Sequence, residues 1–185
     1  MTRRGWFFTT YVAVLGVGAA LAVHPVPRLL WNATASVPVG LYRLHPDPTP
    51  HVGDLVALRL PDVPASLLAR GGYLPLGVPL LKPVAAVAGQ IVCRIALRIT
   101  IDGTPVGDAK PVDHRGRPLP VWQGCRRLSA GQVFVMNPAE PRSLDGRYFG
   151  PFPVADVIGR ATPLWLPSAT QHAAPLSSPS TMKAP

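Results

Sequence analysis

The chain has 185 residues, of which 48% are hydrophobic and 15% charged, so it is long enough to bury one core but not several. Its 24 prolines and 17 glycines argue against a helical bundle and favour a mainly β domain, because proline interrupts both helix interiors and strand ladders. The formal net charge of +9 does not indicate a nucleic-acid partner, since the arginines are dispersed and form no basic helix. Attraction to anionic lipid headgroups and simple solubility both explain this charge.

The first apolar segment, residues 6 to 23, contains no charged side chain and would be about 27 Å long as a helix. This length nearly matches the apolar core of a bilayer, which is about 30 Å thick. Arg3 and Arg4 precede the segment, so we expect residues 1 to 5 in the cytoplasm and the rest of the chain outside it. We predict a retained transmembrane anchor; a cleaved signal sequence is the alternative, because residues 20 to 22 form a small-residue cleavage pattern.

Residues 24 to 166 are expected to form one extracytoplasmic domain, and the Pro/Ser/Ala-rich residues 167 to 185 a disordered tail. Within the domain, the run 55–60 is typical of a strand. Residues 61 to 79 carry several prolines and glycines, which predicts an excursion from the sheet with a short turn of helix at 65–70.

The clearest strand signal runs from Ile91 to Ile101, where apolar residues alternate with other residues in a period of two. This pattern predicts one strand whose odd-numbered side chains, including Cys93, face the core. Asp102 and Gly103 then supply a hairpin turn signal. Two further strands are expected at 132–136 and 156–161.

The chain has two cysteines, Cys93 and Cys125. An extracytoplasmic domain is an oxidising setting for such a pair, so we expect a disulfide between them. Two buried free thiols are the alternative that the spacing leaves open. No histidine lies near either residue in sequence, which argues against a catalytic thiol.

Ser36 lies a few residues beyond the apolar segment, and Lys82 lies downstream between apolar residues. The histidines show neither metal-ligand nor catalytic spacing, and we predict no metal and no cofactor. A lysine replaces histidine as the base for a serine only where an apolar site disfavours its ammonium form. Lys110 and Lys183 lie in loop-like and tail-like sequence, so Lys82 is the candidate base; a surface lysine is the alternative reading.

Several sequence blocks follow one another in a fixed order: SVPVGLY at 36–42, GD at 53–54, KPVAAVAG at 82–89 and SLDGRYFGP at 143–151. Together they resemble the type I signal peptidase family (S26), and within it the TraF-type conjugative transfer signal peptidases. The likeness extends over most of the chain, from Met1 to Ala161.

The resemblance implies a signal-peptidase-like β catalytic domain in the periplasm, held at the bacterial inner membrane by one N-terminal transmembrane helix. It implies that Ser36 is the nucleophile, that Lys82 is the general base, and that the backbone N–H of Ser36 contributes to an oxyanion hole. The supporting residues that it implies are Ser143, which would orient the lysine, Asp145 and Arg147, which would form a loop-stabilising ion pair, and Thr34, a hydroxyl donor to the oxyanion.

The sequence departs from the family pattern at Pro83, Gln90 and Gly146. We expect Gly146 to loosen the loop that sets Asp145, for which a turn or capping role is the alternative. None of these departures removes a group that the chemistry needs.

The resemblance implies a membrane-anchored serine endopeptidase that processes exported precursors, above all a conjugative pilin, by cleavage, with head-to-tail cyclisation of the product as a second outcome. Its partners would be that precursor, the lipid bilayer and other conjugative transfer components. A non-catalytic, membrane-anchored β scaffold of a conjugation or secretion apparatus is the alternative. The runs 70–74 and 122–126 contain aromatic residues that either line the substrate cleft or pack in the core.

Overall fold

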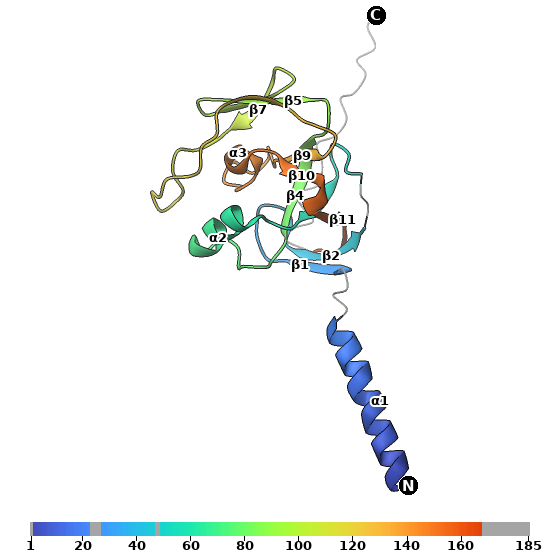
Figure 1. Cartoon of the computed structure of the whole chain (residues 1–185). Coiled ribbons are helices and arrows are strands. Elements are labelled where there is room, and N and C mark those ends of the chain that lie inside the picture. The colour runs from blue at the N-terminus through green and yellow to red at the C-terminus, as the bar shows by residue number, and fades with distance from the viewer. Residues whose placement is uncertain (1, 23–26, 47–48, 168–185) are drawn as a thin grey trace, which may run out of the picture.

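The computed structural model describes residues 2–22, 27–46 and 49–167. Helix α1 (Arg3–Ala22) is followed by a β-rich body built of two antiparallel sheets (Figure 1). The mainly β prediction is therefore confirmed. All but the first residue of the tail predicted at 167–185 lies outside the described residues.

Helix α1 covers most of the segment 6 to 23, so its helical conformation is as predicted. In the described part of the chain, no helix combines the length and the apolar character needed to cross a membrane. The transmembrane span expected from the sequence is therefore not shown.

The larger sheet has seven strands and carries the main core. In spatial order its strands are β1 (Leu29–Asn32), β2 (Gly40–His45), β11 (Val157–Trp165), β3 (Leu55–Leu58), β4 (Leu80–Ala86), β9 (Gln132–Val135) and β10 (Phe152–Pro153). Helix α2 (Asp62–Arg70) lies in the predicted excursion between β3 and β4, and its Leu68 packs with Val56 and Leu80 in one buried cluster. Helix α3 (Gly146–Phe149) and the 3-10 helix η1 (Val154–Asp156) lie in the connections that follow β9.

The smaller sheet has four strands, in the order β7 (Thr104–Asp108), β6 (Arg98–Ile101), β5 (Ile91–Ile95) and β8 (Gly124–Arg127). A second buried cluster joins it to the larger sheet, where Val92 and Ile99 pack with Phe134 of β9. The two sheets thus share apolar contacts close to β9.

The single strand predicted from Ile91 to Ile101 is wrong, because the chain turns back at Ala96 and forms the β5–β6 hairpin. Ala96 adopts a positive φ of 55°, and Gln123 bonds to its backbone N–H and C=O at 3.1 Å each, which stabilises the turn. The buried side chains of β5 are the even-numbered Val92 and Arg94, so Cys93 lies on the opposite face from the one expected. By contrast, the predicted turn at 102–103 does connect β6 to β7.

The position of Cys93 on this outer face allows it to meet the neighbouring strand. Cys93 of β5 lies directly opposite Cys125 of β8, and the two form a disulfide as predicted. This bond joins segments that are 32 residues apart in the sequence.

Candidate active site

Ser36 lies in the loop between β1 and β2, which is organised around the buried side chain of Asn32 at the end of β1. The Asn32 Nδ2 lies 2.8, 3.1 and 3.0 Å from the carbonyl oxygens of Thr34, Val37 and Pro38. Its Oδ1 accepts hydrogen bonds from the Thr34 backbone N–H at 3.2 Å and from the Thr34 hydroxyl at 2.9 Å. One amide therefore closes the whole turn that presents Ser36.

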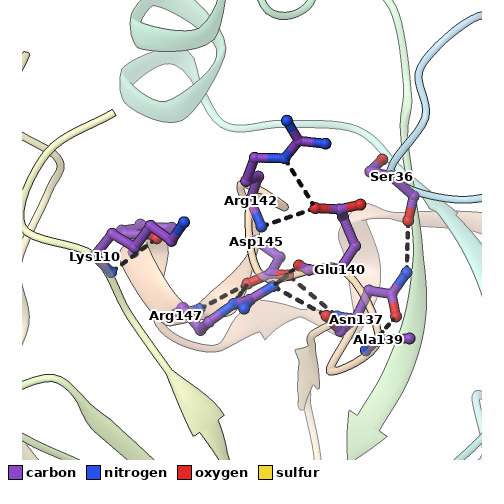
Figure 2. Close-up of polar contacts among 9 residues, drawn as sticks. Ser36, Lys110, Asn137, Ala139, Glu140, Arg142, Asp145 and Arg147 are labelled. Carbon is purple, nitrogen blue, oxygen red and sulfur yellow. Dashed lines mark hydrogen bonds and ion pairs between the residues drawn. The ribbon is translucent and has the colours of Figure 1, made fainter. Parts of the chain in front are cut away.

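A second amide holds the same loop from the opposite side. Asn137, which follows β9, donates from Nδ2 to the Ser36 carbonyl oxygen at 2.6 Å, as Figure 2 shows. The Tyr42 hydroxyl donates to the Pro38 carbonyl oxygen at 2.6 Å. The backbone of the loop is thus fixed by side chains from three separate segments.

Lys82 lies on β4, opposite Val56 of β3, and only 2% of its surface is exposed. Burial lowers the pKa of the Lys82 ammonium from 10.5 to about 8, because an apolar setting disfavours the charged form. The nearby carboxylates of Asp145 and Glu140 oppose this shift, and Arg147 adds to it. The net effect is a lysine that is partly neutral near physiological pH.

Ser36, Lys82 and Ser143 line one cavity of about 720 Å³. Most of its wall is apolar. The apolar lining comes from β1, the α2 region, the start of β4 and the loop before α3: Leu30, Trp31, Leu68, Leu74, Pro75, Val78, Pro79, Leu80, Leu81 and Leu144. Of the two aromatic runs noted in the sequence, Tyr73 lines the cavity, whereas Trp122 is buried in the core.

In this structure the hydroxyl of Ser36 contacts Thr34 Oγ1 at 3.3 Å. Ser143 is buried, and its Oγ has no hydrogen-bond partner among the described residues, so the bond predicted between Ser143 and the lysine is not formed. Catalytic hydrogen bonds are often long before substrate binds and tighten in the complex. The cavity brings the predicted serine, lysine and second serine together without joining them.

The ion pair predicted between Asp145 and Arg147 is present and fully buried. The Arg147 Nη2 lies 2.9 Å from Asp145 Oδ2, and its Nε lies 2.9 Å from Oδ1 (Figure 2). Arg147 also donates to the carbonyl oxygens of Asn137 and Glu140, at 3.0 and 2.8 Å. Asp145 caps the N-terminus of α3 by accepting from the Arg147 backbone N–H at 3.1 Å, so its pairing and capping roles coexist.

The effect expected of Gly146 is wrong, because this glycine tightens the loop. A Cβ added to it would lie 2.6 Å from both the Val135 carbonyl oxygen and the Phe134 ring. The Gly146 carbonyl oxygen accepts from the Trp122 indole N–H at 3.0 Å. The absence of a side chain therefore lets α3 pack directly on β9.

Sequence reasoning missed Asn32, Asn137 and Arg94. Arg94 of β5 is buried, stacks near the Tyr148 ring and donates to the Arg147 carbonyl oxygen at 2.6 Å, which connects the smaller sheet to α3. The only sequence signal for Asn32 was its position two residues before Thr34, a spacing that allows an asparagine to bond its own local backbone. Nothing in the sequence pointed to Arg94.

Comparisons with known proteins identify the family of this chain. The family model described as "Signal peptidase, peptidase S26" matches residues 1–166. The chain belongs to the S26 signal peptidase family.

Its relatives place it among the TraF-type members of the S26 family. It is 39% identical over 140 residues to the probable conjugal transfer protein TraF of Sinorhizobium fredii, covering 70% of this chain and 73% of that protein. It is 36% identical over 175 residues to the conjugal transfer protein TraF of Agrobacterium fabrum, covering 89% of this chain and 98% of that one. A crystal structure of a signal peptidase I from Enterococcus faecalis is 20% identical, with a TM-score of 0.37, and the match covers 62% of this chain and 97% of that chain.

The S26 family model spans the Ser36 loop, the Lys82 strand and the α3 loop, so all parts of the cavity described above fall within the family's matched region. Family membership makes a peptidase-like role the coarse functional conclusion. The relatives' names further connect the chain to conjugal transfer.

Proposed function

We propose that this S26 family member is a serine endopeptidase in which Ser36 is the nucleophile and Lys82 the general base. One observation carries the proposal: the serine and a buried lysine whose pKa is lowered to about 8 line the same apolar cavity. A lysine with this pKa is neutral in about one molecule in ten at pH 7, far more often than a lysine with the ordinary pKa of 10.5, and the neutral form is the one that accepts a proton from a serine.

In the proposed mechanism, the Ser36 Oγ attacks the carbonyl carbon of the scissile peptide bond while its proton passes to the neutral Lys82 Nζ. The Ser36 backbone N–H, which donates to no acceptor among the described residues, is free to stabilise the oxyanion. Lys82 then returns the proton to the leaving amine as the C–N bond breaks. The acyl-enzyme is released when a second nucleophile attacks it and Lys82 again accepts the proton.

The ion pair of Asp145 and Arg147 has a supporting role in this proposal. It fixes the turn that carries Ser143 and Glu140, because Arg147 bonds both Asp145 and the Glu140 carbonyl oxygen. The Ser143 hydroxyl has no hydrogen-bond partner in the part of the chain that the structure describes, and it lines the cavity with Lys82, which supports a role in orienting the lysine side chain when substrate is bound.

For the substrate, we propose an exported precursor, and specifically the pilin precursor of a conjugative transfer system. The TraF names of the relatives support the conjugal context. The apolar cavity wall favours apolar and small side chains beside the scissile bond. The acyl-enzyme would be released either by water, which gives a linear product, or by the amine of the same substrate chain, which gives a ring.

We further propose that the domain lies on the periplasmic side of the bacterial inner membrane, to which α1 attaches it. Trp6, Phe7 and Phe8 of α1 are at least two-thirds exposed, which is costly in water and favourable in contact with lipid. Trp31 and Trp165 stack at 5.8 Å with about half of each exposed, and tryptophan is enriched where proteins meet membrane headgroups. Alkaline extraction of membranes and protease digestion of spheroplasts test attachment and sidedness.

The deciding experiment for the activity is co-expression of the full chain with the pilin precursor, followed by intact-mass measurement of the pilin. A mature mass that appears with wild type and not with Ser36→Ala or Lys82→Ala supports the peptidase, and loss of one further water indicates ring closure. Processing that survives Ser36→Ala contradicts the assignment of the nucleophile. Unprocessed precursor in all samples favours the scaffold alternative.

A further inference from the structure

We propose that Asn32 is a positioning residue for the nucleophile. In this view Asn32 and Thr34 form a relay in which Thr34 accepts a hydrogen bond from the Ser36 hydroxyl in the resting structure. The inference rests on the Ser/Lys peptidase function proposed above, and its test includes a readout that needs no activity.

The first step is the orientation of the Asn32 amide, which its surroundings determine. Carbonyl oxygens only accept hydrogen bonds, so the side-chain atom that faces the carbonyl groups of three loop residues must be the nitrogen. The opposite atom, Oδ1, then faces Thr34 and accepts from both its backbone N–H and its hydroxyl. Only 6% of Asn32 is exposed, so its amide is held among these partners and not in solvent.

The second step follows the hydroxyl protons. Asn32 Oδ1 has no proton, so in the 2.9 Å contact the Thr34 hydroxyl is the donor. A hydroxyl has a single proton to donate, and therefore in its 3.3 Å contact with Ser36 the Thr34 oxygen is the acceptor. In the resting structure the Ser36 hydroxyl therefore donates to Thr34, and it must turn toward Lys82 Nζ when the nucleophile reacts.

The third step is the consequence for catalysis. Asn137 already holds the Ser36 carbonyl group, so the backbone of the nucleophile is fixed. The relay therefore acts on the side-chain rotation of Ser36, which sets the position of Oγ. A reacting atom that is misplaced by about 1 Å can lower the rate by about 10²-fold. Loss of the relay should therefore reduce kcat and leave KM nearly unchanged, because Oγ takes little part in ground-state binding.

The kinetic test is a double-mutant cycle on the full chain with the pilin precursor as substrate. We expect Asn32→Ala and Thr34→Val each to lower kcat by about 10- to 100-fold with KM within about threefold of wild type. The double variant should be no slower than the worse single variant, because both changes interrupt one relay. Thr34→Ser should recover the activity that Thr34→Val loses, and Thr104→Val, on exposed β7, is the matched control.

The second readout is hydrogen exchange of the 33–39 backbone, followed by mass spectrometry. Asn32→Ala should increase exchange in this loop by tenfold or more while exchange of β4 and β9 stays at the wild-type rate. Unchanged exchange overturns the relay whether or not the chain is a peptidase.

Further outcomes separate the relay from the proposed function. Rate losses that multiply in the double variant, or an unaltered kcat in a folded Thr34→Val, overturn the relay while the peptidase proposal stands. If wild type processes nothing but the loop exchange responds as expected, the proposed function fails and the positioning role of Asn32 in the loop is retained.

Discussion

Replacing Lys82 by methionine should abolish peptidase activity and at the same time stabilise the fold at neutral pH. The lysine is almost fully buried, and burial is the main reason why its pKa falls from 10.5 to about 8. Methionine retains an unbranched apolar side chain of similar length without the ammonium group. The Asp145 carboxylate does not lose its counter-charge in this variant, because Arg147 pairs with it.

The size of the effect follows from proton linkage. The pKa of Lys82 is lower in the folded state than in the unfolded state, so between pH 8 and 10.5 the unfolded chain binds more protons and wild-type stability rises with pH. At about 1.4 kcal/mol per pKa unit, the buried lysine costs about 3 kcal/mol of stability near pH 7. Near pH 9.5 the remaining cost is about 1.4 kcal/mol, so the advantage of Lys82→Met should shrink by about 2 kcal/mol over this interval.

Urea unfolding followed by tryptophan fluorescence measures this difference for the full chain in one detergent at both pH values. Lys110→Met is the matched control, because Lys110 is exposed and its replacement should give the same small change at either pH. A stability difference for Lys82→Met that does not vary with pH would refute the reasoning, since it would mean that the folded protein does not desolvate this lysine.

Three other predictions follow from the same contacts. Because Lys82 acts in its neutral form, kcat/KM should rise about tenfold per pH unit up to about pH 8 and then level off. Initial rates measured between pH 6 and 10 check this prediction, and a profile that still rises at pH 10 contradicts it. Gly146→Ala should lower the free energy of unfolding by about 1–3 kcal/mol, because its Cβ would meet the Val135 carbonyl oxygen at 2.6 Å; a thermal midpoint equal to wild type would show that α3 is free to shift. Replacing both Cys93 and Cys125 by serine should cost about 2–4 kcal/mol by opening a loop that spans 32 residues; equal denaturant midpoints without reductant would show that the bond is not formed in solution.

Local patterns predicted the elements that depend on near neighbours. The helix at α2 and the turn at 102–103 follow from the sequence because their signals lie within a few residues. The strand expected over 91–101 failed for a related reason: alternation continued through the turn at Ala96, whose stability comes from Gln123, far along the chain. The alternation of apolar residues within 91–101 contains no information about a hydrogen-bond partner at position 123.

The candidate site shows the same limit. The serine, the lysine and the Asp145–Arg147 pair were all selected from sequence, through the resemblance and the elimination of other lysines. The packing role of Gly146 could not be predicted, because it depends on how closely β9 approaches α3. The loop-closing role of Asn32 likewise depends on carbonyl groups whose directions are set only in the folded loop.

The order of strands in the larger sheet has a consequence for when activity can begin. Ser36 is carried by the β1–β2 connection and Lys82 by β4, and β11 lies between β2 and β3 in the sheet. The Ser36 segment and the Lys82 strand are therefore connected within the sheet through β11. This strand is synthesised after β1, β2, β3 and β4. In the folded sheet, β2 and β3 are connected only through Val157–Trp165, which lies between them. We therefore expect the proposed peptidase activity to begin only after this last long strand has paired with β2 and β3.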